Sequence, residues 1–352
     1  MKKSKLLVGV FCVFFLVLLM AACNQETTND NQPNVNAEEG TVETSSEIDL
    51  TGENILLSTG SESGTVYPVG VQLAEFLQSM GAVATNTTGN AIVNLELMEI
   101  NEADIGHSSS FLGFAAENGL EPFEGRKFEN IRALAKLMDN TFQFVVLEDS
   151  GINSLEKVAE QQYPLTLGVS QPGSEAELTT RRVLEAYGIT YDDIKDWGGR
   201  VEFGSHGDLG SLLRDGHIEA MAIVSSVPAA AVTEIDLQRP MKVLSLSDDI
   251  IKELTENFGY DISEVSDDVY KGQSNAATTL VGGLVFYAHK DLPDEIVYEL
   301  TKFINEGGKE RISSIHHQLE DYLTGSESTA TGLGTILHPG AEQYYKDAGI
   351  ID

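Results

Sequence analysis

Short apolar runs alternate with segments of helical periodicity from Asn54 to the C-terminal end of the chain. Uninterrupted short runs predict strands, and apolar residues that recur at intervals of three and four predict helices. The predicted strands cover residues 55–57, 104–107, 142–147, 165–169, 201–203, 220–224 and 280–288, and the clearest predicted helices cover residues 69–80, 175–187 and 294–304. This alternation is typical of α/β folds in which helices cover mostly parallel sheets.

Two stretches in different halves of the chain share a second pattern. Leu97, Asn101 and Asp104 precede the serines at 108–110, and Leu212, Gly216 and Glu219 precede Ser225. Each stretch predicts a helix, a left-handed stop, a short strand and a turn with hydroxyl side chains, because Gly and then Asn are the usual residues at such a stop. Two similar α/β lobes would explain the pattern, and chance or a generic βα unit would explain it as well.

The first 23 residues have the features of an export signal. Three lysines precede an uncharged apolar run at residues 6–22, which ends in two alanines before Cys23. The arrangement resembles a bacterial lipoprotein signal, in which the cysteine is lipidated and becomes the new N-terminus. An uncleaved membrane anchor is the alternative, because the run is just long enough to span a bilayer. Both interpretations predict an extracytoplasmic protein held at the outer face of the membrane.

Composition limits what the exported part can do. Residues 24–51 are rich in Asn, Glu and Thr and contain no aromatic residue, which predicts a disordered tether. The net charge of −33 becomes −36 when residues 1–23 are removed, and such a surface repels nucleic acid. The only cysteine besides Cys23 is Cys12, inside the apolar run, so we expect no disulfide in the exported part.

Five loops before predicted helices are rich in glycine or hydroxyl side chains. They lie at residues 58–67, 87–90, 108–110, 171–174 and 225–228, and none contains Lys or Arg. Free N–H groups at a helix start attract anions, and ligands of open α/β sheets bind at the carboxyl ends of the strands. A small anion held at these loops would depend on helix N-termini and hydroxyls rather than on an ion pair. For any single loop, an ordinary turn is the alternative.

The sequence contains no clear signature of catalysis or of metal binding. Residues 60–64 do not form a nucleophile elbow because Glu62 stands at their centre. His316 and His317 are adjacent and would point in different directions on a helix, which makes them a poor metal pair. His107, next to the serines at 108–110, is the only local candidate for a nucleophile–base pair, and a structural histidine is the favoured interpretation. We therefore expect no enzyme activity, no metal and no cofactor.

Six segments, in this order, resemble the TAXI family of solute-binding proteins, the receptors of one class of TRAP transporters. They are 59–70 (TGSESGTVYPVG), 87–98 (TTGNAIVNLELM), 101–110 (NEADIGHSSS), 168–179 (GVSQPGSEAELT), 215–220 (DGHIEA) and 338–349 (HPGAEQYYKDAG). The resemblance covers about residues 52–352. It implies an α/β, two-lobed periplasmic-binding-protein fold of type II-like topology, with lobe 1 at 52–145 and 276–352 and lobe 2 at 146–275. The chain would cross between lobes near residues 142–150 and 275–280.

The resemblance also implies a function. A small anionic solute such as glutamate or 2-oxoglutarate would be captured by closure of the cleft and passed to a TRAP permease in the membrane. By matching position, the ligand-binding residues would be Gly64, Thr65, Tyr67, Asn90, Asn94, Ser109, Gly173, Ser174 and Ser225. Ala91, Asn101 and Glu62 depart from the family pattern, and Glu62 would repel a carboxylate if it faced the cleft. A receptor for a membrane sensor and a surface-anchored enzyme on the same scaffold are the alternatives.

Overall fold

The computed structural model describes residues 48–62, 64–323 and 326–352, which belong to one compact unit. The predicted signal at 1–23, including Cys23, and residues 24–47 of the predicted tether lie outside the described residues. The last residues assigned to the tether are part of the folded unit. Leu50 is only 4% exposed, and its backbone N–H donates to the carbonyl oxygen of Met80 over 2.8 Å. The predicted boundary at residue 51 is therefore too late, because Ile48 and Leu50 pack against the core.

The described residues form a single sheet of ten strands. The strands are β1 (Asn54–Ser58), β2 (Val83–Thr87), β3 (Ile105–Ser109), β4 (Ile131–Leu147), β5 (Thr166–Val169), β6 (Arg200–Phe203), β7 (Ala220–Ser225), β8 (Met241–Val243), β9 (Asp261–Val265) and β10 (Ala277–His289). Their order is β2-β1-β3-β10-β4-β7-β5-β6, with β8 paired to β4 and β9 paired to β10. Within the groups β1–β3 and β5–β7 the strands are parallel. The predicted α/β class is confirmed.

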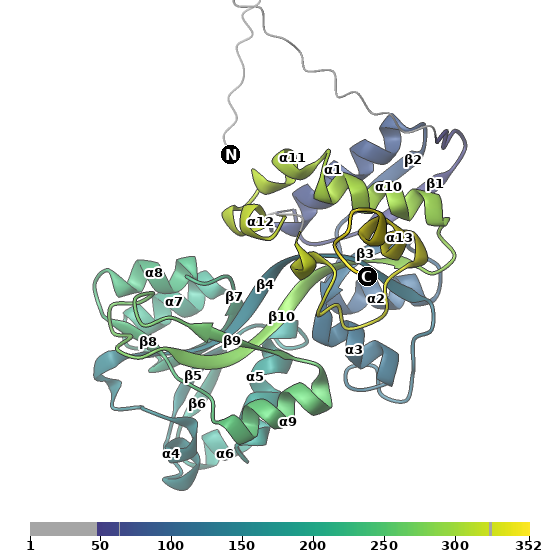
Figure 1. Ribbon diagram of the computed structural model, residues 1–352. Coiled ribbons are helices and arrows are strands. Elements are labelled where there is room, and N and C mark those ends of the chain that lie inside the picture. The colour runs from purple at the N-terminus through teal and green to yellow at the C-terminus, as the bar shows by residue number, and fades with distance from the viewer. Residues whose placement is uncertain (1–47, 63, 324–325) are drawn as a thin grey trace, which may run out of the picture. The chain divides into compact units, whose positions relative to one another are not determined.

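The two long strands β4 and β10 lie side by side and join the two groups of strands (Figure 1). Leu284 of β10 pairs with Ser109 of β3, whereas Thr141 of β4 pairs with Ser225 of β7. Val281 pairs with Thr141 between these points, so β4 and β10 pass from one group of strands to the other near these two residues. The prediction of a mostly parallel sheet is wrong. A chain that leaves along β4 and returns along β10 runs in opposite directions, which makes the centre of the sheet antiparallel.

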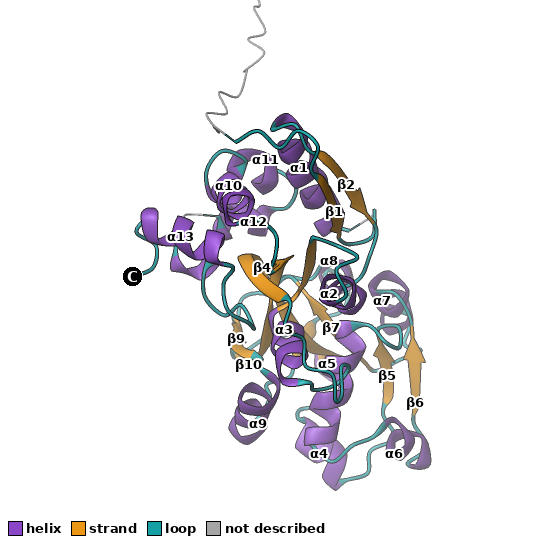
Figure 2. Cartoon of the chain, turned by 90° about the vertical axis from the view of Figure 1, so that its right-hand side faces the viewer, coloured by secondary structure: helices purple, strands orange, loops and turns teal. Residues whose placement is uncertain are grey.

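Helices cover both faces of the sheet (Figure 2). They are α1 (Val66–Ser79), α2 (Ala91–Glu99), α3 (Ser110–Asn118), α4 (Leu155–Glu160), α5 (Glu175–Ala186), α6 (Tyr191–Asp196), α7 (His206–Arg214), α8 (Ala230–Asp236), α9 (Asp248–Phe258), α10 (Asp294–Asn305), α11 (Lys309–Ser313), α12 (His317–Tyr322) and α13 (Pro339–Asp347). The three clearest predicted helices correspond to α1, α5 and α10. Across the described ranges, no helix is long and apolar enough to cross a membrane.

The apolar core consists of three clusters. One packs α1 and α10 against the group β1–β3, and another packs α7 and α8 beside β7. The third cluster extends through both groups of strands, because it includes Phe111 of α3, Phe144 of β4 and Leu178 of α5. Phe111 also stacks on Tyr260 at the start of β9, with ring centroids 4.3 Å apart. The two groups of strands are thus joined by a common core as well as by β4 and β10.

The repeated pattern in the sequence corresponds to equivalent backbone geometry. Asn101 after α2 has φ 57°, and Gly216 after α7 has φ 74°, so both chain reversals are left-handed. The next strand begins beside an acid in each case. Asp104 accepts a hydrogen bond from the backbone N–H of Leu56 in β1 at 2.8 Å, and Glu219 accepts one from the first residue of β5 at 3.3 Å. Each acid thereby fixes the neighbouring parallel strand.

The left-handed position of Asn101 gives the first testable prediction. A side chain with a Cβ is strained there, and Asn tolerates the strain better than Ala. We expect Asn101→Ala to lower the free energy of unfolding by about 1 kcal/mol, and Asn101→Gly to leave it unchanged or slightly higher. Urea unfolding of the chain lacking residues 1–23 measures both changes. Glu102→Ala, at the exposed neighbouring position, is the control, and equal losses in all three variants would contradict the argument.

Candidate ligand cleft

A cleft of about 630 Å³ lies where the two groups of strands face each other. Its lining comes from segments that follow β1 and β2 and from His107 near the end of β3 on one side, and from segments that follow β5 and β6 on the other. The lining residues are Gly60, Ser61, Gly64, Val66, Gly89, Asn90, Ala91, Ile92, His107, Ser170, Gln171, Pro172, Gly173, Ser174, Glu175, Ala176, Gly204, Ser205 and His206. All of these segments lie at the carboxyl ends of parallel strands, where α/β sheets bind ligands. The volume is in the range that holds a small molecule.

Four helices, α1, α2, α5 and α7, begin at this cleft. Three of them are capped by side chains of the lining. Asn90 accepts hydrogen bonds from the N–H groups of Ile92 and Val93, and Ser174 and Ser205 each accept one in the first turns of α5 and α7. The other first-turn N–H groups have no acceptor within their helix and carry the positive end of its dipole. Since the lining contains no Lys or Arg, these helix ends are the main source of positive potential.

The predicted site residues fall into two groups. Gly64, Asn90, Gly173 and Ser174 line the cleft, whereas Thr65, Tyr67, Asn94, Ser109 and Ser225 do not. Thr65 is the N-cap residue of α1, and the Tyr67 carbonyl accepts a hydrogen bond from the Asn86 amide. Ser225 lies at the end of β7 and pairs with Thr141 of β4. Of the five predicted loops, those at 58–67, 87–90 and 171–174 contribute lining residues, and those at 108–110 and 225–228 contribute none.

Asn94 is fully buried and fastens the lining segments to one another. Its Oδ1 accepts a hydrogen bond from Ser58 at 2.8 Å, and its Nδ2 donates to the carbonyl oxygens of Thr59 and His107 at 3.3 and 2.9 Å. Its Nδ2 also lies 3.0 Å from Nδ1 of His107. Asn94 thus ties α2 to the ends of β1 and β3, and it has no free group for a ligand.

His107 presents a neutral ring to the cleft. Burial lowers the pKa of His107 to about 4, so the imidazole is uncharged near neutral pH. Nδ1 of His107 lies 3.0 Å from the amide Nδ2 of Asn94, so the ring is held against α2 on that side. Ser108 donates instead to the Ala91 carbonyl oxygen at 2.7 Å, and within the described residues no hydrogen bond joins His107 to a serine hydroxyl. A nucleophile–base pair is therefore not assembled at this position.

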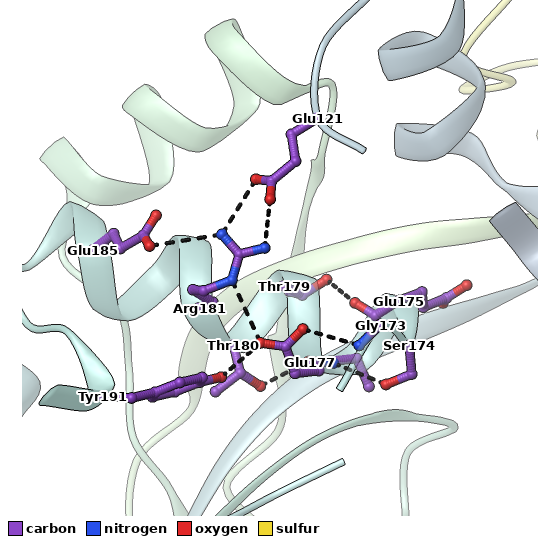
Figure 3. A network of polar contacts seen from close by, with 11 residues as sticks. Glu121, Gly173, Ser174, Glu175, Glu177, Thr179, Thr180, Arg181, Glu185 and Tyr191 are labelled. Carbon is purple, nitrogen blue, oxygen red and sulfur yellow. Dashed lines mark hydrogen bonds and ion pairs between the residues drawn. The ribbon is translucent and has the colours of Figure 1, made fainter. Parts of the chain in front are cut away.

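A partly exposed ion-pair network holds the α5 end of the cleft (Figure 3). Arg181 pairs with Glu121, in the loop after α3, at 2.6 Å and with Glu177 at 3.4 Å. Glu177 in turn accepts hydrogen bonds from the backbone N–H of Gly173 at 3.3 Å and from the hydroxyl of Tyr191 at 3.2 Å. The position of the Gly173 loop thus depends on a contact that reaches to the segment after α3. No cluster of metal-ligating side chains occurs in the described ranges.

Sequence reasoning missed the loop at 204–206 and two residues next to predicted loops, Ser170 and Glu175. Ser205 caps α7 and accepts a hydrogen bond from the N–H of Asp208 at 3.2 Å, and burial lowers the pKa of His206. A serine followed three residues later by an acid, just after a predicted strand, is a recognisable helix start. Glu175 gave no signal, because acids are too common in this chain to single one out.

Glu175 is the first residue of α5, and its carboxylate lines the cleft half-buried. Burial raises the pKa of Glu175 to about 7, and the nearby Ser109 hydroxyl on β3 acts in the opposite direction. The Glu175 side chain points away from the Arg181 network (Figure 3). It forms no ion pair with any described residue, so the cleft holds a carboxylate that is costly to ionise.

The fold and the cleft define an α/β protein with a polar cleft between two groups of parallel strands, which two long strands join. In the comparison with protein families, residues 57–349 match the model of the NMT1-like family. The chain therefore belongs to the NMT1-like family.

Similar folds occur among solved periplasmic binding proteins. A TctC solute-binding protein from Polaromonas is 16% identical, with a TM-score of 0.47, and 85% of this chain and 96% of that chain are covered. The aliphatic sulphonate binding protein SsuA from Escherichia coli is 14% identical, with a TM-score of 0.42 and coverage of 85% and 84%. PhnD1 from Prochlorococcus marinus, in complex with methylphosphonate, is 15% identical, with a TM-score of 0.44 and coverage of 76% and 95%. At these identities the similarity concerns the fold alone.

The close packing at Gly89 gives the second prediction. A Cβ at this position would lie 2.1 Å from Oδ1 of Asn94 and 2.6 Å from Oγ of Ser58. We expect Gly89→Ala to lower the free energy of unfolding by about 2 kcal/mol, because the loop and the Asn94 hydrogen bonds cannot both be kept. Gly207→Ala is the matched control, since a Cβ there meets no atom within 4 Å. Equal midpoints for the two variants in urea unfolding would contradict the packing argument.

The carboxylate of Glu175 gives the third prediction, on pH. Between pH 4.5 and about 7 the folded protein keeps the Glu175 proton that the unfolded chain releases, so this residue makes stability fall as pH rises. We expect Glu175→Gln to be more stable than the natural protein by about 2 kcal/mol at pH 8, with the advantage shrinking toward pH 5. Thermal unfolding across this range measures the difference. A constant difference at every pH would show that Glu175 titrates normally.

Proposed function

We propose that the protein is an extracytoplasmic solute-binding receptor of the TAXI class, which captures a small carboxylate and delivers it to a TRAP-type membrane permease. One observation carries the proposal: four helices begin at a single cleft between the two halves of the sheet. Converging helix N-termini bind a carboxylate without a cationic side chain. Glutamate and 2-oxoglutarate fit both the cleft volume and the resemblance of the loop sequences to that family.

The proposed lobes are residues 52–145 with 276–352, and residues 146–275. Ligand capture would close these lobes on each other by bending of β4 and β10 near Thr141 and Val281, as hinge closure does in periplasmic binding proteins. The polar loops on both sides of the cleft would then contact one solute simultaneously. The proposed ligand contacts come from Asn90 on one side and from Gly173 and Ser174 on the other.

The proposal includes the attachment of the chain to the membrane. A lipid on Cys23 would hold the receptor near the permease, and the segment between Cys23 and the folded unit would set its reach. A receptor that signals to a membrane sensor would use the same cleft and the same anchor. An enzyme on this scaffold has less support, because His107 contacts Asn94 and not a serine.

Thermal unfolding of the chain lacking residues 1–23, stripped of co-purified solute by unfolding and refolding, tests the receptor proposal. A solute present at 100 times its dissociation constant should stabilise the protein by about 2.7 kcal/mol. We expect a shift with carboxylates or amino acids and none with neutral sugars. Turnover of the bound solute would favour the enzyme alternative, and the absence of a shift with every solute class would reject the receptor.

Single substitutions test the placement of the site. Ser174→Ala and Asn90→Ala should each weaken binding by about tenfold, because each removes a polar group from the cleft and loosens a helix N-terminus there. Ser225→Ala is the matched control, since this serine lies outside the cleft lining. Calorimetric titration with the solute found above measures all three. An equal effect of Ser225→Ala would mean that the solute binds elsewhere.

A further inference from the structure

The cleft contains one acid that nothing in the described chain neutralises. Glu175 is the first residue of α5 and lines the cleft, whereas the other acids of this helix are paired: Glu177 and Glu185 both contact Arg181. Arg182, on the same helix, is engaged elsewhere. Its guanidinium donates to the carbonyl oxygen of Glu121 and lies 4.5 Å from the ring centroid of Phe258. The carboxylate of Glu175 is therefore left for an occupant of the cleft.

Two buried hydroxyls, one beside this carboxylate and one in the cleft lining, lack partners. Ser109 Oγ and Ser170 Oγ are buried and complete no hydrogen bond with any described group. Ser109 lies close enough to Glu175 to influence its pKa, and yet the two do not meet in hydrogen-bond geometry. Ser170, at the end of β5, lines the cleft itself. Buried hydroxyls without partners are rare in folded proteins, so the hydroxyl of Ser170 in the lining that also contains Glu175 indicates a polar ligand group in the cleft.

The other titratable groups that face Glu175 carry no charge near neutral pH. On the cleft side these are His107 from β3 and His206 from α7, and burial lowers the pKa of both. On the inner side they are the hydroxyls of Tyr260 and Tyr287, whose pKa values are raised by burial first and by Glu175 in addition. The cleft lining supplies no positive charge, and on the inner side the guanidinium of Arg182 donates to the hydroxyl of Tyr260 at 3.3 Å. A cation that meets Glu175 within the cleft therefore has to come from the ligand.

We propose that Glu175 determines the specificity of the cleft by accepting a hydrogen bond from a protonated amino group of the solute. This inference rests on the proposed receptor function and narrows the class of solute that the receptor binds. The helix N-termini hold the carboxylate of the solute, and Glu175 holds its ammonium group. The preferred solute is then an amino acid, and the corresponding 2-oxo acid is disfavoured because it places a carbonyl oxygen against a carboxylate.

Matched pairs of solutes test the proposal. The stripped chain lacking residues 1–23 is titrated calorimetrically at pH 8 with four pairs: L-glutamate and 2-oxoglutarate, L-aspartate and oxaloacetate, L-alanine and pyruvate, and L-leucine and 4-methyl-2-oxopentanoate. Within any pair that binds, the amino acid should bind at least about tenfold more tightly than the oxo acid, as expected for a charge-assisted hydrogen bond. Equal or tighter binding of the oxo acid would overturn the proposal.

Variants separate the role of Glu175 from that of its surroundings. Glu175→Gln should weaken binding of the amino acid by about tenfold or more and leave binding of the oxo acid unchanged or tighter. Glu185→Gln removes the same charge from the same helix, outside the cleft, and should change neither affinity by more than about twofold. Amino acid binding by Glu175→Gln that equals that of the natural protein would overturn the proposal. Loss of affinity through misfolding is excluded when the unfolding midpoint of this variant is not lowered.

The pH dependence distinguishes the two ways in which a carboxyl group can meet a ligand. If Glu175 accepts a hydrogen bond from an ammonium group, affinity falls as the pH is lowered from 8 to 6 and Glu175 takes up a proton, and the fall is absent in Glu175→Gln. If instead a protonated Glu175 donates to a ligand carboxylate, affinity rises over the same range, which would overturn the proposal. The pKa of His107 near 4 keeps that residue neutral in this range.

Different binding results would reject this inference and the receptor proposal. Tight binding of a solute without nitrogen, such as a dicarboxylate, would reject the role of Glu175 and leave the receptor function standing. A stripped protein that binds no member of the four pairs, no dicarboxylate, no amine and no sugar would reject the receptor function, and this inference with it. Mass spectrometry of the unstripped protein checks either result, because a retained solute shows directly whether it contains an amino group.

Discussion

The pairing of β4 with β10 is the constraint on which the rest of the structure depends. These strands hydrogen-bond to each other from Thr141 and Val281 to Ile131 and His289, and each also borders one group of parallel strands. The carboxyl ends of both groups consequently face the same cleft, with loops from both sides lining it. A change in the angle between the two groups of strands has to occur where β4 and β10 pass from one group to the other. The fold therefore combines a fixed hydrogen-bond register with one place that can bend.

Buried polar networks, and not the loops themselves, fix the shape of the cleft. Asn94 holds the loops after β1 and β3 through bonds to Ser58, Thr59 and His107. On the other side, Glu177 holds the Gly173 loop and is itself held by Arg181. The hydrogen bonds of Asn94 are expensive to disrupt, because each broken bond leaves a buried polar group unsatisfied. Both networks leave the helix N-termini and a few lining side chains free to meet a ligand.

The electrostatics of the cleft are unusual for a site that is expected to hold a carboxylate. The lining contains no Lys or Arg, His107 is neutral, and Glu175 is an acid that burial makes costly to ionise. The positive ends of four helices and a single carboxylate therefore face the same volume. A zwitterionic solute would satisfy both features, with its carboxylate at the helix ends and its ammonium group at Glu175.

The sequence by itself determined the α/β class, the positions of α1, α5 and α10 and most strands, and the polar loops that surround the cleft, because periodicity and turn chemistry are local properties. It also marked Asn101 and Gly216 as left-handed stops. The tertiary structure alone decided that Asn94 is a buried fastener, that Ser225 pairs with β4 outside the cleft, and that Glu175 stands unpaired within it. Burial, charge partners and strand direction at the centre of the sheet depend on residues far apart in the chain, and no local pattern records which of them meet.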